Sequence, residues 1–408
     1  MKSIPTLASI AMLLLSTNTS SDTLNFAQAL QTTLSSHPLV ESKRSEQAAA
    51  KAEQEGAEWQ RYPSASVEAN TASNGDNASV LRLDQPVWSG GRITAGIEAA
   101  GSRLSAAGTA VEETRQELAL NVITAVSEAL RLQARMIHAK ASVGEHEKLL
   151  AMIQRRVQQE VSPIADRRLA ESRLYSTMNE LSVTTQGMQN ALAQLGQLTG
   201  KAVTNIDSAG YTQWASSDGL SDDLAQAIER AQAHSPVMRR LGFEAQAANA
   251  DIDSKRSAYW PQLTLRLESS HGSVSDNRAL LVLQAQPGAG LSARSGVSAA
   301  LARRESTRLA KEAARREIQQ QISLDWNEWM ASRSRVETAE QVRSTSADVS
   351  ESYARQYTAG RKTWLDVLNA VREASQAELA LADARSQMYA AVLRLKLRTG
   401  TLNIEGGK

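Results

Sequence analysis

The side chains that could perform chemistry are few in this 408-residue chain, and their spacing suits no catalytic centre. The five histidines are scattered, and no two have the spacing of metal ligands on one helix: His37, His138, His146, His234 and His271. The string Gly360-Arg361-Lys362-Thr363 resembles the end of a phosphate-binding loop, but the upstream glycine that such a loop requires is absent. We therefore expect no enzyme activity, no metal and no other cofactor.

Charge and composition exclude further classes of protein. The chain carries 45 Lys and Arg against 44 Asp and Glu, for a formal net charge of +1. Nucleic-acid binding needs concentrated positive charge, so we expect no nucleic-acid partner. The absence of cysteine excludes disulfides, thiolate zinc sites and an acylated N-terminal cysteine. Aromatic residues make up 4% of the chain, which is typical of long helices packed through small side chains, and no run of about 18 apolar residues predicts a transmembrane helix.

The N-terminal residues have the pattern of a secretory signal. Lys2 precedes the apolar stretch Ile10-Ala11-Met12-Leu13-Leu14-Leu15, and small polar residues follow over 16–21. Because this stretch is too short to span a bilayer permanently, we predict a signal peptide over 1–21 and export of the remaining chain. The alternative is a frayed apolar terminus.

The chain contains an internal duplication. Pro38, Tyr62-Pro63 and Thr199-Gly200 recur at nearly constant spacing as Pro236, Trp260-Pro261 and Thr399-Gly400. Such self-similarity predicts two structural repeats of the same order, each a helix, a strand pair and a long helical hairpin. We predict a first repeat over 22–200, a linker over 201–221, a second repeat over 222–400 and a C-terminal tail over 401–408.

Each repeat contains the hydrophobic spacing of a long coiled coil. Eleven of twelve residues at alternating four- and three-residue steps are apolar in the first repeat: Leu118, Val122, Ala125, Ala129, Leu132, Met136, Ala139, Val143, His146, Leu150, Ile153 and Val157. This pattern predicts a helix over 92–158, which at about 1.5 Å per residue is about 100 Å long. We expect helices 38–58 and 163–199 to pack end to end along it. The predicted hairpins are 91–200 and 291–398.

The segments before these hairpins alternate with a period of two. Leu263, Leu265 and Leu267 alternate with polar residues, which predicts a strand with one apolar face. We expect strand pairs at about 62–88 and 260–287, with strands of about ten residues, the length that a tilted membrane-spanning strand requires. The alternative, two solvated hairpins on a cytoplasmic coiled coil, leaves the apolar face unexplained.

Four membrane strands cannot close a barrel, and open sheet edges in hydrocarbon would leave backbone groups unpaired. The chain must therefore share its strands with other copies. The expected fold is mainly α with a small β part: duplicated antiparallel coiled-coil hairpins, and four membrane β-strands that close a barrel only in the oligomer.

Two strings of residues resemble the TolC family of outer-membrane efflux and secretion channels over essentially the whole mature chain. They are Gln85-Pro86-Val87-Trp88-Ser89-Gly90-Gly91-Arg92 at the strand-to-helix exit and Tyr357-Thr358-Ala359-Gly360-Arg361-Lys362-Thr363-Trp364-Leu365-Asp366-Val367-Leu368-Asn369 at the second helical turn. Repeat one has a degenerate form of the second string, ending at Asp166, and repeat two lacks the aromatic at its strand exit. The string 360–366 is most similar to the branch of LapE and AggA, which export large adhesins by a type I route.

This resemblance implies a homotrimer with a twelve-stranded barrel in the outer membrane and a helical tunnel in the periplasm, closed at its tip. The implied partners are a periplasmic membrane-fusion (adaptor) protein, an inner-membrane ABC transporter, outer-membrane lipid and an exported protein substrate. An efflux channel for drugs or other small molecules has the same architecture and remains the alternative. A periplasmic adaptor protein also uses coiled-coil hairpins, but the tandem duplication with two strand pairs argues against it.

The two helical turns contain the residues expected at a gate. Asp166 and Asp366 fall in the first turn of the helices that follow, where a carboxylate stabilises the exposed amide groups. One interpretation is helix capping. The other, which the resemblance implies, is a ring of acids at the tunnel mouth, with Lys362 paired to Asp166 and Tyr357 donating a hydrogen bond. Asn369 replaces a second acid of some relatives, which makes the ring less negative. Gly90 and Gly91 are expected to let the backbone turn sharply from strand to helix.

Overall fold

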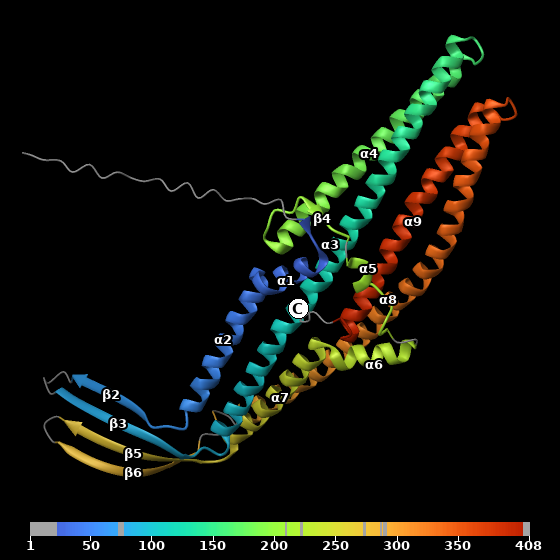
Figure 1. The fold of residues 1–408 in the computed structure, drawn as a ribbon. Coiled ribbons are helices and arrows are strands. Elements are labelled where there is room, and N and C mark those ends of the chain that lie inside the picture. The colour runs from blue at the N-terminus through green and yellow to red at the C-terminus, as the bar shows by residue number, and fades with distance from the viewer. Residues whose placement is uncertain are drawn as a thin grey trace, which may run out of the picture.

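The chain forms an elongated molecule with a small sheet at one end and two long helical hairpins at the other (Figure 1). The computed structural model describes residues 23–71, 77–208, 210–220, 223–271, 275–285, 288 and 292–402. The predicted signal peptide, the end of the second predicted strand pair at 286–287 and most of the predicted C-terminal tail lie outside the described residues. The order of elements matches the predicted fold class, mainly α with a small β part, which is confirmed.

The first repeat follows the expected order. Its elements are α1 (Phe26–Ser36), α2 (Pro38–Trp59), β2 (Ser64–Thr71), β3 (Asn77–Trp88), α3 (Arg92–Gln158) and α4 (Ile164–Thr199). His37 separates α1 from α2 because Pro38 has no amide proton to donate to the preceding turn. The His37 ring accepts a hydrogen bond from the Leu39 amide and so caps the second helix.

The second repeat reproduces the first. Its elements are α6 (Leu224–His234), α7 (Pro236–Arg256), the short 3₁₀ helix η1 (Ser257–Tyr259), β5 (Gln262–His271), β6 (Asp276–Gln284), α8 (Ser292–Thr358) and α9 (Trp364–Thr399). Helices α3 and α8 both have 67 residues, and α4 and α9 both have 36, as expected of a duplicated chain. Gly200 and Gly400 end α4 and α9 in the left-handed conformation that glycine adopts without strain.

The segment between the repeats, predicted only as a linker, forms elements of its own. Strand β4 (Asn205–Ile206) pairs in parallel with β1 (Thr23–Leu24), and the short helix α5 (Tyr211–Trp214) follows it. Tyr211 and Trp214 pack edge-on against Phe26 of α1, with ring centroids 5.5 and 5.8 Å apart. This contact buries Phe26, which is 1% exposed, against the joint between the repeats.

The hydrophobic core lies between helices. None of the twelve seam residues predicted for α3 is exposed, and the largest buried cluster joins α3 to α1, α4 and the end of α9. The one polar seam residue, His146, is 5% exposed, and its Nδ1 forms a 2.9 Å hydrogen bond with the Ser142 carbonyl. The seam therefore tolerates an imidazole because the backbone of its own helix satisfies the ring.

The four longer strands form one antiparallel sheet in the order β2-β3-β5-β6. Strands β2 and β6 are its edges, so each has one row of backbone groups without a partner in this sheet. Neighbouring strands alternate in direction, and β6 of one copy would therefore run antiparallel to β2 of the next. Sheets of neighbouring copies can therefore pair with both edges of this sheet, and the barrel closes only in the trimer.

Candidate functional site: a two-faced sheet and the helical tips

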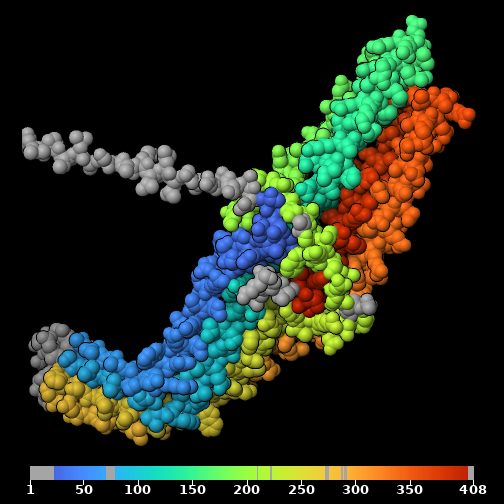
Figure 2. Space-filling view, in the orientation of Figure 1, coloured from blue at the N-terminus to red at the C-terminus, as the bar shows by residue number. Residues whose placement is uncertain are grey.

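One face of the sheet is a continuous leucine surface. Residues that are directly opposite in an antiparallel pair share a face, and Leu267 lies opposite Leu83 while Leu265 lies opposite Leu281. These side chains remain 37–66% exposed because no other described element covers the face. In Figure 2 the sheet projects away from the helices at one end of the molecule.

The other face of the same sheet is charged. The Arg266 guanidinium donates two hydrogen bonds to Asp84, at 2.7 and 3.0 Å. Glu268 lies between Arg278, at 2.6 Å, and Arg82, at 3.3 Å. The ion-paired side chains of this face are three acids and three bases: Glu68, Asp84, Glu268, Arg82, Arg266 and Arg278.

The contrast between the two faces determines how the sheet sits in a membrane. A basic side chain on the lipid face of a barrel costs about 2–4 kcal/mol near the bilayer midplane, whereas the lumen accepts charge. The leucine face must therefore meet lipid, and the charged face must line the channel. We describe the two surfaces below as the lipid face and the lumen face.

Two glycines, Gly90 and Gly91, connect the first strand pair to α3, and the structure requires glycine at each for a different set of reasons. Gly90 has φ +61°, and a Cβ there would lie 3.0 Å from the Trp260 Cβ and 3.2 Å from the Ser257 carbonyl. Gly91 has φ +89°, but a Cβ there would meet no atom within 4 Å. Gly90 is thus required by both conformation and close approach, and Gly91 by conformation alone.

The tips of the two hairpins are joined by an apolar cluster within one protomer. Trp364, 3% exposed, packs with Ile153 of α3, Ala170 of α4 and Val367 of α9. Its indole Nε1 donates a 3.1 Å hydrogen bond to the Asp166 carbonyl. Trp364 was not among the predicted gate residues. The signal was available, because a bulky aromatic stands here in repeat two where repeat one has Ile164.

Tyr357 extends this contact between the tips. Its hydroxyl lies 3.4 Å from the Ser162 hydroxyl, and the Arg156 guanidinium lies over its ring at 4.9 Å. Because Ser162 and Arg156 belong to the first hairpin and Tyr357 to the second, the structure places Tyr357 between the two tips.

Asp366 caps its own helix. Its carboxylate accepts hydrogen bonds from the Thr363 amide and hydroxyl, at 3.0 and 2.8 Å, and the Thr363 hydroxyl in turn accepts one from the Asp366 amide. The hydrogen bonds from Thr363, helped by the nearby charge of Lys362, hold the pKa of this carboxyl below its usual range. Asp366 is therefore ionised at neutral pH, and its carboxylate is hydrogen-bonded to Thr363, the N-cap of its own helix.

The remaining predicted gate residues are not joined within the protomer. The Lys362 ammonium lies 4.1 Å from the centre of the Tyr353 ring, and among the described residues it makes no ion pair with Asp166. Asp166 lies in the first turn of α4, and Asn369 lies half-buried one turn beyond Asp366. A Lys362–Asp166 pair would have to form between protomers.

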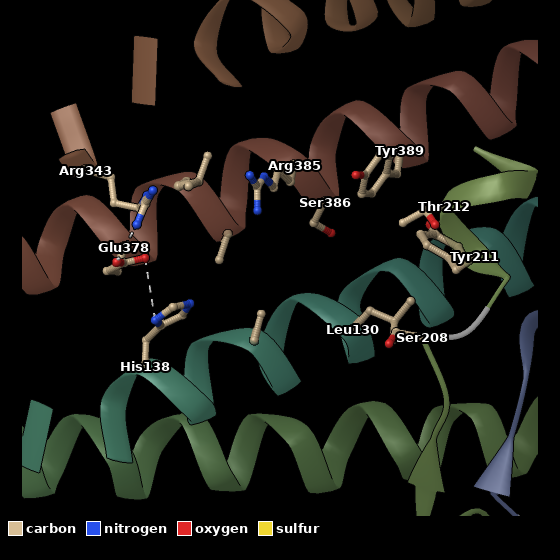
Figure 3. Close-up of a pocket in the computed structure, with 13 residues that line it drawn as sticks. Leu130, His138, Ser208, Tyr211, Thr212, Arg343, Glu378, Arg385, Ser386 and Tyr389 are labelled. Atoms are coloured by element: carbon tan, nitrogen blue, oxygen red, sulfur yellow. Dashed lines mark ion pairs between the residues drawn. The ribbon is translucent and has the colours of Figure 1, made fainter. Parts of the chain in front are cut away.

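A groove lies between the two helical hairpins (Figure 3). It has a cavity volume of about 540 Å³ between α3 and α9, beside α5. Glu378 lies 3.7 Å from His138 and 3.5 Å from Arg343, so α9 is tied to both α3 and α8. Burial raises the pKa of Tyr211, at one end of the groove, to about 12, so its hydroxyl stays protonated.

The described residues contain neither a candidate metal site nor a helix that could cross a membrane. They contain no group of three or more His, Cys, Asp or Glu side chains placed to hold a metal ion. Of the helices in the described part of the chain, none is long and apolar enough to cross a membrane.

Comparisons with known proteins agree with this geometry. The model of the outer membrane efflux protein family matches residues 29–201 and 227–401, so each repeat is matched. A solved membrane protein from Pseudomonas aeruginosa superposes with a TM-score of 0.79 at 18% identity, covering 92% of this chain and 90% of that one. CusC superposes with a TM-score of 0.83 at 15% identity, covering 92% and 91%. VceC from Vibrio cholerae gives 0.78 at 16% identity, covering 92% and 96%. No curated protein sequence matches the chain.

The fold and the two-faced sheet define a subunit of a passive outer-membrane channel with a periplasmic helical tunnel. The chain belongs to the outer membrane efflux protein family. The predicted resemblance to TolC-like channels is confirmed at the level of the family, as are the outer-membrane location and the assignment as a non-enzyme. Channels of this kind are homotrimers that work with an adaptor and an inner-membrane transporter.

Proposed function

We propose that this chain is the outer-membrane conduit of a type I system that secretes a large adhesin-like protein. The observation that carries the proposal is the string 360–366 at the second helical turn, which is most similar to the adhesin-export branch of the TolC family. In this assignment the partners are a periplasmic adaptor and an inner-membrane ABC transporter, which supplies the energy.

The lumen face is compatible with a polypeptide cargo. Its three paired acids and three paired bases neutralise one another, so these groups leave no strong field of one sign along the wall. An unfolded chain carries both signs of charge and would be held back by a wall dominated by either one. Charge balance therefore supports passage of a mixed-charge polymer.

We further propose that the helical tips form the periplasmic gate. Within a protomer, Trp364 and Tyr357 hold the two tips together, so the moving unit would be a joined pair of hairpins. Between protomers, Lys362 of one copy would pair with Asp166 of the next. The residues proposed for this gate are Asp166, Tyr357, Lys362, Asp366 and Asn369.

Deletion of the gene in its native host tests the cargo. Loss of a large protein from the cell surface, with drug susceptibility unchanged, is the expected result. Complementation with the intact chain should restore the surface protein, and complementation with Leu265→Arg, which places a charge on the lipid face, should not. Cells that keep their surface proteins but become hypersensitive to dyes and detergents would support the alternative, a channel for small-molecule efflux.

A further inference from the structure

Each protomer contributes four helices side by side to the tunnel, and the two outermost helices are its edges. Away from the sheet the order across the wall is α4, α3, α9, α8, and nearer the sheet it is α2, α3, α7, α8 (Figure 1). Helix α8 is thus one edge along its whole length, and α2 followed by α4 is the other. In a closed ring of three copies, α8 of each copy must meet α2 and α4 of the next.

The internal duplication provides a template for this junction between copies. Helices α3 and α8 begin at Arg92 and Ser292, so their equivalent residues lie 200 positions apart, as do those of α4 and α9. Helices α2 and α7 begin at Pro38 and Pro236, a spacing of 198. Helix α3 of the first repeat packs on α7 and α9 of the second. Each of these contacts therefore has an equivalent at which α8 packs on α2 and α4 of the next copy.

Within one protomer, the contact between α3 and α9 is polar. The Asp383 carboxylate lies 3.0 Å from the Arg131 guanidinium and 2.6 Å from that of Arg135. Closer to the tips, Glu378 lies 3.7 Å from His138. These side chains make the joint between the two hairpins of one protomer an ionic joint.

At the junction between copies the equivalent residues are mostly apolar. Val183 and Met178 of α4 replace the two acids of α9, and in the protomer they are 61% and 46% exposed. The cation at these positions, Arg335, is already paired with Glu328 of its own helix at 2.6 Å. The equivalent pairs are Ala331 with Val183, Thr338 with Met178, and Val342 with Tyr175.

The last of these pairs has the closest template. Within the protomer the Ser375 hydroxyl donates a 3.2 Å hydrogen bond to the Ser142 hydroxyl. Tyr175 of α4 and Val342 of α8 occupy the equivalent positions, and they are 68% and 48% exposed. A polar contact within the protomer is thus replaced by two exposed apolar side chains on its opposite edges.

The apolar row on α8 extends beyond these pairs. Met330 and Val349 are also exposed, and they correspond to Leu130 and Leu149, which line the grooves between the hairpins. From 330 to 349 the row is about 30 Å long, at about 1.5 Å per residue. An apolar edge of this length favours burial against another protein surface, because apolar side chains are more stable away from water. The next copy is the surface that the ring places there.

Nearer the sheet, the template is an ion pair. Arg103 of α3 lies 2.6 Å from Asp251 of α7. The equivalent residues at the junction are Arg303 of α8 and Glu53 of α2, which again carry opposite charges. Both side chains are exposed, and within the described part of the chain neither makes an ion pair. The junction between copies would supply each with its partner.

The other ion pairs between α3 and α7 are not reproduced. One has two acids, Glu312 and Glu41, as its equivalents, and another has two uncharged residues. Both acids are already neutralised on their own helices, Glu312 by Arg316 at 3.3 Å and Glu41 by Arg44 at 3.2 Å. Their like charges therefore oppose the junction little.

We propose that neighbouring copies meet in an apolar joint, in which α8 packs on α4 of the next copy in the register of the α3–α9 contact. Nearer the sheet, Arg303 pairs with Glu53 of the next copy. The tunnel wall then alternates between an ionic joint within each protomer and an apolar joint between protomers. Because salt screens charges but leaves apolar contacts intact, the ionic joints are the ones that high salt loosens. The apolar joint consists of Tyr175, Met178 and Val183 of α4 and Ala331, Thr338 and Val342 of α8.

Disulfide trapping tests the register of the apolar joint. The natural chain has no cysteine, so a bond can form only between introduced residues. Val342→Cys with Tyr175→Cys is the first variant. In its template the hydroxyl oxygens of Ser142 and Ser375 are 3.2 Å apart, which is close enough for cysteines at such positions to form a disulfide. Trimers reconstituted into vesicles are oxidised with copper phenanthroline and separated on denaturing gels without reductant.

Two matched variants accompany this one. Ser142→Cys with Ser375→Cys should form its bond within one chain and keep the mass of a monomer. Val342→Cys with Ser182→Cys moves one cysteine by two turns along the same face of α4, and it should stay unlinked.

The expected result is bands of two and three linked chains from Val342→Cys with Tyr175→Cys alone. Linked chains from Val342→Cys with Ser182→Cys instead would show another register and overturn the proposal. Absence of linked chains from both variants, with trimers intact on unheated gels before oxidation, would show that these helices do not meet and would also overturn it. If the first variant does not assemble, Thr338→Cys with Met178→Cys tests the same register about one turn away by the same criteria.

Charge reversal tests the ion pair separately. Arg303→Glu should lower the temperature at which the trimer dissociates at low salt, because it brings two acids together, and adding Glu53→Arg should restore that temperature. Arg304→Glu is the control, since it makes the same charge change at the neighbouring exposed residue, whose equivalent is Leu104. The effect of Arg303→Glu should shrink at about 1 M salt, where charges are screened within about 3 Å. Equal effects of the two reversals, or no recovery in the double variant, would refute the ion pair and the register near the sheet.

Discussion

The substitution Leu265→Arg is the most direct test of the membrane orientation. Leu265 lies near the centre of β5, is 39% exposed, and faces Gln85 and Leu281 on the two neighbouring strands. No acid of the lumen face can reach a side chain on this side of the sheet. The new guanidinium would therefore enter hydrocarbon without a partner.

The structure sets the size of the expected effect. Residue 265 lies within about 5 Å of the strand's centre, at about 3.3 Å per residue, so the midplane cost applies nearly in full. That cost is about 2–4 kcal/mol per chain and about 6–12 kcal/mol for three chains of a trimer. Because about 1.4 kcal/mol corresponds to a tenfold change, the insertion constant per chain should fall about 30- to 700-fold.

The chain offers a matched control one residue away. Thr264 lies opposite Pro86 and Val282 and points to the lumen face, so Thr264→Arg adds the same charge to the opposite side of the same strand. Arg266→Gln removes a lumen charge and should also be tolerated, because Asp84 stays accessible to water in the channel.

The assay is refolding of urea-unfolded chains into vesicles, with the fraction of heat-modifiable trimer read on unheated gels. Leu265→Arg should lose most of this trimer, whereas Thr264→Arg and Arg266→Gln should retain it. The opposite pattern, with Leu265→Arg assembling normally and Thr264→Arg failing, would show that the assignment of the two faces is reversed.

Three further predictions concern the gate and the turn. Lys362→Glu should raise single-channel conductance at low salt, and adding Asp166→Lys should restore the closed state. Each exposed pair contributes only about 0–1 kcal/mol. Unchanged conductance in Lys362→Glu would exclude a Lys362–Asp166 ion pair that holds the gate closed. Gly90→Ala should reduce trimer yield more than Gly91→Ala, because both need a left-handed conformation costing about 1–2 kcal/mol but only Gly90 also meets Trp260. Asp366→Asn should lower the thermal stability of the tips at neutral pH. Since the folded-state pKa is depressed, the difference should disappear as pH falls through it, which heat-modifiability at acid pH would reveal.

Much of the fold could be predicted because it depends on neighbours in the sequence. The seam along α3 indicated the type of that helix, and the predicted bounds 92–158 coincide with Arg92–Gln158. Alternation at Leu263, Leu265 and Leu267 similarly predicted a strand with an apolar face. Helical and strand periodicities express which side of a local backbone is buried, so one sequence is enough to detect them.

The candidate site was less predictable because its contacts cross the duplication. Asp366 stands in a capping position that is visible from Thr363 three residues earlier, but the link from Trp364 to the Asp166 carbonyl joins residues from different repeats. No local pattern specifies such a bond. It arises only when the two hairpins are laid side by side.

The sequence by itself determined that the chain is duplicated, helical, equipped with two strand pairs and unable to close a barrel alone. Only the tertiary structure decided that β1 pairs with β4, that Glu268 lies between Arg82 and Arg278, and that the register of β3 on β5 shifts between Pro86 and Trp88. The physical reason is the range of the interaction. Periodicity follows from the geometry of consecutive residues, whereas register, bulges and ion pairs depend on how distant segments are aligned, and a shift of one residue reverses the face that every side chain presents.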